Sequence, residues 1–177
     1  MVTSAPNGDP TPAPGGDPTP APAGDDLLLA RAVDLAERNV AAGGGPFGAL
    51  VLRGDEVVAE GVNRVTLDLD PTAHAEVVAI RAACRALGTF SLAGCRLISS
   101  CEPCPLCLSA ALWSRLDAVV FDADRDDAAA AGFDDRAFYE AFAVPRERWS
   151  MPVRQQRSAR AAAPFTAWGA AAERTAY

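Results

Sequence analysis

The strongest constraint on this 177-residue chain comes from its single histidine and from two cysteines that follow it. His74 stands two residues before Glu76, and Cys104 and Cys107 form a C-x-x-C pair that begins 30 residues after His74. Cysteines three positions apart at the start of a helix project to the same side, so both sulfurs can reach one ion. One imidazole and two thiolates suit tetrahedral zinc with a fourth position left for water. The chain must therefore fold so that two distant segments meet at one point.

Glu76 adds chemistry to this predicted zinc site, because it can reach a metal-bound water without occupying the metal. The pairing of H-x-E with P-C-x-x-C is the signature of zinc deaminases that act on nucleobases, in which the glutamate transfers protons. Each half alone is a weak signal, since H-x-E occurs often by chance and C-x-x-C also has structural and redox roles. The conjunction of the two is specific.

Two other interpretations of the cysteines compete with a catalytic site. Cys101 could join the three predicted ligands in a closed structural site, which would leave Glu76 without a role. An iron–sulfur cluster would need a fourth cysteine, drawn from Cys84 or Cys95. The pattern places these two in a helix and near a strand, where small buried thiols are the simpler interpretation.

The charge of the chain argues against a polyanionic partner. Its net charge is −7, with 16 basic residues, all of them arginine. An acidic protein is poorly suited to gripping a phosphate backbone. No apolar run is long enough to cross a bilayer, and the N-terminus lacks the basic and apolar regions of a signal peptide. These features favour a cytoplasmic protein with a small-molecule substrate, and nucleic acid is not expected as a partner.

The chain divides into a tail and one domain. Residues 1–24 repeat the stretch GDPTPAP and are poor in bulky apolar side chains, which predicts a disordered tail. Residues 25–177 alternate between helical and strand patterns, which predicts an α/β sandwich around about five strands. Helices are expected at 25–40, 73–87, 105–116, 136–142 and 163–172, and strands at 47–52, 57–62, 96–99 and 118–122.

Taken together, the motifs resemble the cytidine deaminase-like superfamily, and most of all its bacterial guanine deaminase branch. The resembling stretches cover most of residues 25–177 and reach the C-terminus. They are GGPFGALV (44–51), EGVNRVT (60–66), DPTAHAEVVAIRAAC (70–84), SCEPCPLCLSA (100–110), AAAAGFDD (128–135) and PFTAWGAA through Tyr177 (164–177). The resemblance implies a three-layer α/β/α sandwich around a mixed five-stranded sheet, and a homodimer whose subunits exchange their C-terminal segments.

The resemblance also implies roles for residues that spacing alone leaves open. Without it, Asn63 and Asp135 are plausible turn or cap residues, and Phe47 and Trp113 plausible core residues. With it, His74, Cys104 and Cys107 correspond to the zinc ligands and Glu76 to the proton carrier. The implied substrate contacts are Asn63, the backbone of Ala75, the aromatic walls Phe47 and Trp113, the acidic Asp135, and Tyr177 from the partner subunit.

The implied reaction is the hydrolysis of guanine to xanthine and ammonia with zinc as the cofactor. Guanosine is the main competing substrate, and an amino-triazine or cytosine are further alternatives. A tRNA adenosine is disfavoured by the acidic composition and the absence of lysine. An alternative from another class is a noncatalytic zinc-stabilised binding module, which four protein ligands would favour over three plus water.

Overall fold

The computed structural model describes residues 24–133 and 135–175. Its elements in chain order are α1 (Asp25–Ala41), β1 (Gly48–Arg53), β2 (Glu56–Val62), α2 (Val65–Asp68), α3 (Ala75–Leu87), β3 (Cys95–Cys101), α4 (Pro105–Trp113), β4 (Ala118–Ala123), α5 (Arg125–Ala130), α6 (Arg136–Phe142), a 3-10 turn (Arg146–Arg148) and α7 (Ala163–Ala170). The tail predicted at 1–24 lies outside the described residues except for Gly24.

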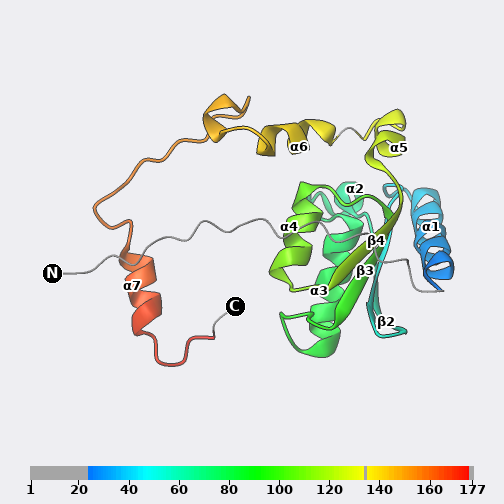
Figure 1. Cartoon of the computed structure of the whole chain (residues 1–177), viewed down its shortest axis with the longest axis horizontal. Coiled ribbons are helices and arrows are strands. Elements are labelled where there is room, and N and C mark those ends of the chain that lie inside the picture. The colour runs from blue at the N-terminus through cyan, green and yellow to red at the C-terminus, as the bar shows by residue number, and fades with distance from the viewer. Residues whose placement is uncertain (1–23, 134, 176–177) are drawn as a thin grey trace, which may run out of the picture.

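A mixed sheet in the order β2-β1-β3-β4 forms the centre of the fold (Figure 1). Strand β1 pairs antiparallel with β2 and with β3, while β3 and β4 run parallel. The sheet in the described part of the chain has four strands, one fewer than the five expected. These four are the strands that the sequence locates individually, whereas the fifth was expected from the alternation of helices and strands and from the resemblance without being assigned to a segment.

Helices cover both faces of this sheet, which confirms the predicted three-layer α/β/α sandwich. Strand β1 alternates between the two layers, as the period of two in a strand requires. Leu50 and Leu52 pack toward α1, whereas Ala49 and Val51 pack toward α3. All four side chains are fully buried. Figure 1 shows α1 on one side of the sheet, and α3 and α4 on the other.

Glycine at position 61 brings the start of α3 close to the sheet. A Cβ atom at Gly61 would lie 2.2 Å from the backbone oxygen of Ala75, the first residue of α3. Only a residue without a side chain allows this approach. Because His74 and Glu76 flank Ala75, this contact places both of them at the edge of the sheet.

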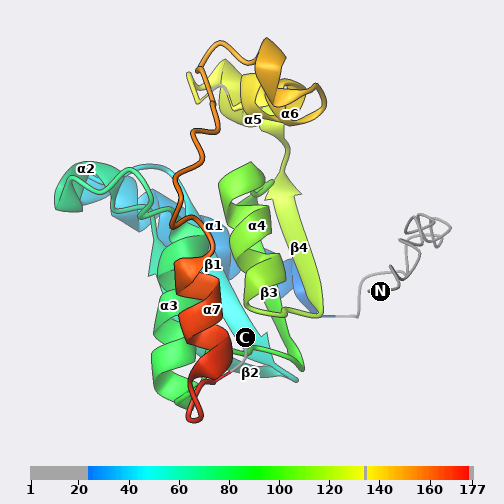
Figure 2. The same cartoon turned by 90° about the vertical axis from the view of Figure 1, so that its left-hand side faces the viewer.

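After β4 the chain leaves the sandwich. Helices α5 and α6 lie beyond the end of β4, and α7 lies apart from the α/β layers (Figures 1 and 2). The exposed apolar side chains of α7 include Phe165, at 77% of its possible exposure. No helix in the described ranges combines the length and the apolar character that a membrane span needs.

Candidate active site

Two helix starts bring the three predicted metal ligands together. His74 is the N-cap residue of α3, Cys104 is the N-cap residue of α4, and Cys107 lies in the first turn of α4. Pro105 opens α4, as expected for a residue that has no backbone N–H to satisfy. The three ligand atoms lie within 4.8 Å of one another.

The spacing of these atoms fits a tetrahedral zinc ion. His74 Nδ1 lies 3.6 Å from Cys104 Sγ and 3.5 Å from Cys107 Sγ, and the two sulfurs are 3.7 Å apart. Zinc bonds of about 2.3 Å to sulfur and about 2.0 Å to nitrogen place two sulfurs about 3.8 Å apart, and sulfur and nitrogen about 3.6 Å apart. His74, Cys104 and Cys107 therefore form a zinc-binding triad, which no fourth protein ligand joins among the described residues.

The protonation of the triad without metal already favours a thiolate. The Cys107 thiol and the His74 imidazole, both hydrogen-bonded to the Cys104 sulfur, lower the pKa of Cys104 to about 4. The same contact with Cys104 raises the pKa of His74, because a thiolate stabilises the imidazolium. The pKa of Cys107 is raised, because its sulfur contacts the Cys104 sulfur and because it is buried. The triad without metal thus already carries one negatively charged sulfur, which favours the binding of a cation.

Glu76 lies beside the triad with its carboxylate almost fully buried. The Ser99 hydroxyl on β3 donates to Oε1 at 3.3 Å, and the Cys107 thiol donates to Oε2 at 3.4 Å. Burial raises the pKa of Glu76, because a low-dielectric environment disfavours the charged form. A raised pKa makes the ionised carboxylate a better proton acceptor, which suits a group that receives a proton and then passes it on.

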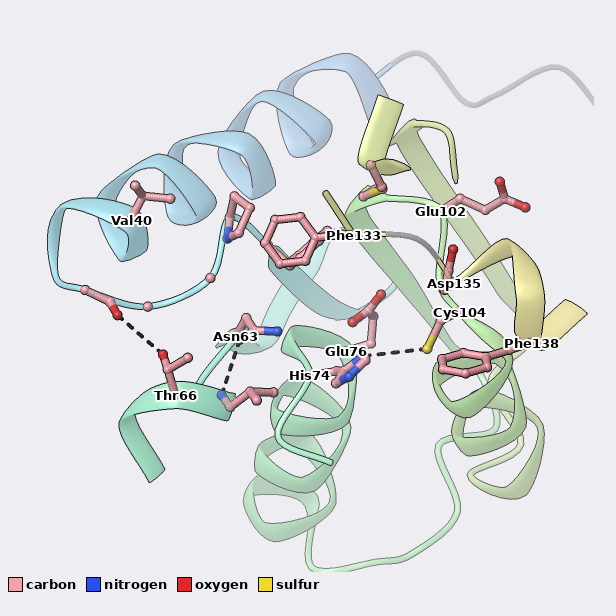
Figure 3. A pocket seen from close by; sticks show the side chains of 18 residues that line it. Val40, Asn63, Thr66, His74, Glu76, Glu102, Cys104, Phe133, Asp135 and Phe138 are labelled. Carbon is pink, nitrogen blue, oxygen red and sulfur yellow. Dashed lines mark hydrogen bonds between the residues drawn. The ribbon is translucent and has the colours of Figure 1, made fainter. Parts of the chain in front are cut away.

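The triad opens into a cavity of about 640 Å³. Figure 3 shows His74, Glu76, Cys104 and Asp135 gathered in one part of it, with the Asn63 side chain pointing in from the position just after β2. The rings of Phe47 and Phe133 meet edge to face, with their centroids 5.0 Å apart. The remaining lining residues are Val40, Gly43, Gly44, Gly45, Pro46, Val65, Thr66, Cys101, Glu102, Ala128 and Phe138.

Of the predicted substrate contacts, Phe47, Asn63 and Asp135 line this cavity. The Asn63 Oδ1 accepts a hydrogen bond from the Val65 amide at 3.2 Å, which orients its amide group. Burial raises the pKa of Asp135. Its Oδ1 is buried and has no hydrogen-bond partner among the described residues, so it is available to a ligand.

The other predicted contacts are placed differently. Ala75 is fully buried between two lining residues, but is not itself part of the lining. Trp113, predicted as a pocket wall, is not among the residues that line the cavity in the described chain and is 64% exposed. Its position two residues after buried Ala111 turns it to the opposite side of α4, where it lies 5.9 Å from the Arg115 guanidinium. Tyr177 lies outside the described residues.

The structure also reveals a buried residue that the sequence analysis missed. Asn39 on α1 donates from Nδ2 to the backbone oxygens of Gly45 and Asn63, each at 2.7 Å. Both carbonyls belong to residues that line the cavity. An amphipathic pattern shows only that position 39 lies on a helix, so no local signal could have identified this contact between segments far apart in sequence.

The chain matches a known protein family, a characterised relative and a solved structure. Residues 23–123 match the family described as the cytidine and deoxycytidylate deaminase zinc-binding region. The guanine deaminase of Bacillus subtilis strain 168 is 49% identical over 144 residues, which cover 81% of this chain and 92% of the relative. The X-ray structure of guanine deaminase from Bacillus subtilis superposes with a TM-score of 0.83 at 47% identity, covering 86% of this chain and 98% of the other.

Two further solved structures are more distant but inform the choice of ligand. A guanine deaminase from Nitrosomonas europaea is 36% identical, with a TM-score of 0.60 and 65% of each chain covered. A complex with 2,6-diaminopurine is also 36% identical, with a TM-score of 0.61, and covers 63% of this chain and 62% of the other.

Proposed function

Because the chain belongs to the cytidine and deoxycytidylate deaminase family, we propose that it is a zinc-dependent aminohydrolase that converts guanine to xanthine and ammonia. The observation that carries this proposal is the buried carboxylate of Glu76, beside a zinc-binding triad that opens into an aromatic-walled cavity. The relatives named guanine deaminase support the same substrate here. The 2,6-diaminopurine held by a related structure supports a purine ligand.

Glu76 carries the protons in the proposed reaction. His74, Cys104 and Cys107 would hold a zinc ion, which when bound would lower the pKa of a water molecule toward neutrality. Glu76 accepts a proton from the attacking water and delivers it to the ring nitrogen next to the amino-bearing carbon. Glu76 then takes the remaining proton from the hydroxyl group added to that carbon and passes it to the amino group, which leaves as ammonia while the carbon keeps the oxygen as a carbonyl. Ser99 donates to Oε1 of Glu76, and Cys107 would lose the proton that it donates to Oε2 on binding zinc, so Oε2 is the oxygen that moves protons.

The cavity offers a polar group on each side of a bound base. Asn63 and Asp135 hold opposite edges of the purine in this proposal, while Phe47 packs against its face. The backbone at Ala75 supports the base next to Glu76. A site with buried polar groups rejects analogues that leave them unpaired, which gives the proposed specificity for guanine.

The assembly proposed for this enzyme is a homodimer. Residues 25–177 form the deaminase domain, and residues 1–24 are a dispensable tail. Helix α7 lies apart from the sandwich with apolar side chains exposed, as expected of a segment that packs on a partner subunit (Figure 1). Tyr177 of that partner would complete the base pocket. The proposed location is the cytoplasm.

Guanosine is the second candidate substrate, because of the size of the cavity. A volume of about 640 Å³ lies in the middle of the range of about 300–1,000 Å³ that ligand pockets span. A base alone does not fill it, so a ribose has room if no partner segment occupies the same space.

The test is a panel of aminated compounds incubated with the purified, zinc-loaded protein. The panel contains guanine, guanosine, adenine, cytosine and an amino-triazine, and ammonia release is measured for each. Guanine is expected to be turned over with the highest kcat/KM, and chromatography should show xanthine in equal amount to the ammonia. Faster release from guanosine would transfer the assignment to the nucleoside, and no release from any compound would refute the proposal.

A further inference from the structure

Three side chains outside the triad join the chain that follows β4 to the loop that carries Cys104. The Arg125 guanidinium forms an ion pair with Glu102, which includes a hydrogen bond from Nε to Oε2 of 2.9 Å. The same guanidinium stacks over the ring of Tyr139, 3.9 Å from its centroid. The Tyr139 hydroxyl donates to the backbone oxygen of Pro103 at 2.6 Å. We call Glu102, Arg125 and Tyr139 the α6 clamp.

One end of the clamp holds the residues immediately before a zinc ligand. Glu102 and Pro103 directly precede Cys104, and Pro103 is fully buried. The Pro103 carbonyl and the Cys104 nitrogen belong to one planar peptide group, so a displacement of this carbonyl moves Cys104 as well. The carbonyl has little access to water, which makes the Tyr139 hydroxyl its important partner.

The other end of the clamp holds a wall of the cavity. Asp135 is the N-cap residue of α6, and Phe138 directly precedes Tyr139 in the same helix. Both residues line the cavity, and Figure 3 shows them next to Cys104. Helix α6 has no buried residue of its own, so apolar packing contributes little to its position. The clamp supplies polar contacts where packing is weak.

We propose that Tyr139 and Arg125 are positioning residues that hold the Asp135–Phe138 wall and the Cys104 loop as one unit. Loss of the clamp then weakens metal binding and ligand binding together, although neither residue lines the cavity or belongs to the triad. The metal part of this inference stands on geometry alone. The ligand part rests on the proposed deaminase function.

The first experiment measures metal binding by Tyr139→Phe and Arg125→Gln, with a chelator in competition for zinc. Partners outside the ligand shell typically change metal affinity by 10–100-fold, and we expect about a tenfold loss for each variant. The cobalt(II) form should show a shifted visible absorption band, because the geometry at the Cys104 thiolate changes. A clamp that only stabilises the fold would lower the melting temperature and leave the cobalt spectrum unchanged.

Arg31→Gln is the matched control, since Arg31 forms an exposed ion pair with Glu60 of the same chemistry. It should bind zinc as the unaltered protein does. Arg125→Lys tests the clamp if Arg125→Gln does not fold, because it keeps the charge but loses the planar stack on Tyr139. Wild-type zinc affinity and an unchanged cobalt spectrum in both Tyr139→Phe and Arg125→Lys would overturn the proposal.

The second experiment measures guanine turnover by the zinc-saturated variants. KM should rise about tenfold in Tyr139→Phe with a smaller change in kcat, because the wall moves while Glu76 stays in place. Binding of 2,6-diaminopurine should weaken in parallel. An unchanged KM together with unchanged binding of 2,6-diaminopurine would refute the coupling between wall and loop. Absence of guanine turnover in the unaltered protein would instead count against the proposed function, and the zinc measurements would still decide the metal part.

Discussion

Replacing Asn39 by leucine should destabilise the protein and impair binding of the base at the same time. The side chain is buried, and its two N–H groups are both used, on the carbonyls of Gly45 and Asn63. Leucine has a similar size but no donor, so both carbonyls lose their partner. A buried polar group left unpaired costs about 1–3 kcal/mol. The Gly45 carbonyl is only partly buried, which lowers its share, and the expected loss in the free energy of unfolding is about 2–4 kcal/mol.

Urea denaturation of the zinc-loaded variant measures this loss, and steady-state kinetics with guanine measures the rise in KM. Gln156→Leu is the control, because it removes an amide of the same kind from an exposed position. Its free energy of unfolding should change by less than about 0.5 kcal/mol. An Asn39→Leu variant whose free energy of unfolding changes by no more than that margin, and whose KM for guanine is unaltered, would refute this prediction. The two hydrogen bonds would then hold neither the glycine loop nor Asn63.

Three further predictions concern the pocket and the assembly. Glu76→Gln keeps the size of the side chain but cannot carry a proton, so zinc should stay bound while kcat falls by about 10²–10⁴-fold; activity within about threefold of the unaltered enzyme would exclude the role. Gly45→Ala places a Cβ atom 2.8 Å from Oδ1 of Asn63, so KM for guanine should rise while zinc content, measured by atomic absorption, stays the same; an unaltered KM would show that Asn63 does not hold the base. Deletion of residues 175–177 should spare zinc and the fold but reduce turnover strongly, and mixing this protein with Glu76→Gln chains should restore part of the activity; no restoration would contradict a shared pocket.

The sequence predicted the core of the fold and the metal site well, because both rest on short-range patterns. The helix at Arg136–Phe142 was predicted with its observed bounds, and the four strands were located to within three residues. His74, Cys104 and Cys107 were identifiable because residue type and spacing together define a ligand set. The short helices α2 and α5 were not predicted, since four and six residues are too few to show a helical period.

Contacts between segments far apart in the chain could not be predicted from the sequence. Nothing local relates Tyr139 to Pro103, 36 residues away, or Asn39 to Asn63, 24 residues away. The role of Trp113 was taken from the resemblance, and in the structure the helical turn after Cys107 and Ala111 places it outside the cavity lining. A fifth strand was expected from the alternation of helices and strands as well as from the resemblance, but no strand pattern in this chain located it.

In the proposed function, the deamination of guanine depends on one zinc ion per chain, bound by His74, Cys104 and Cys107. The most direct measurement removes the metal with a chelator, returns zinc in steps, and follows xanthine formation from guanine at each step. We expect no turnover without zinc, and a rate of xanthine formation that rises linearly with added zinc until about one zinc per chain is bound. Full turnover by the metal-free protein, or metal-loaded protein that forms no xanthine, would contradict it.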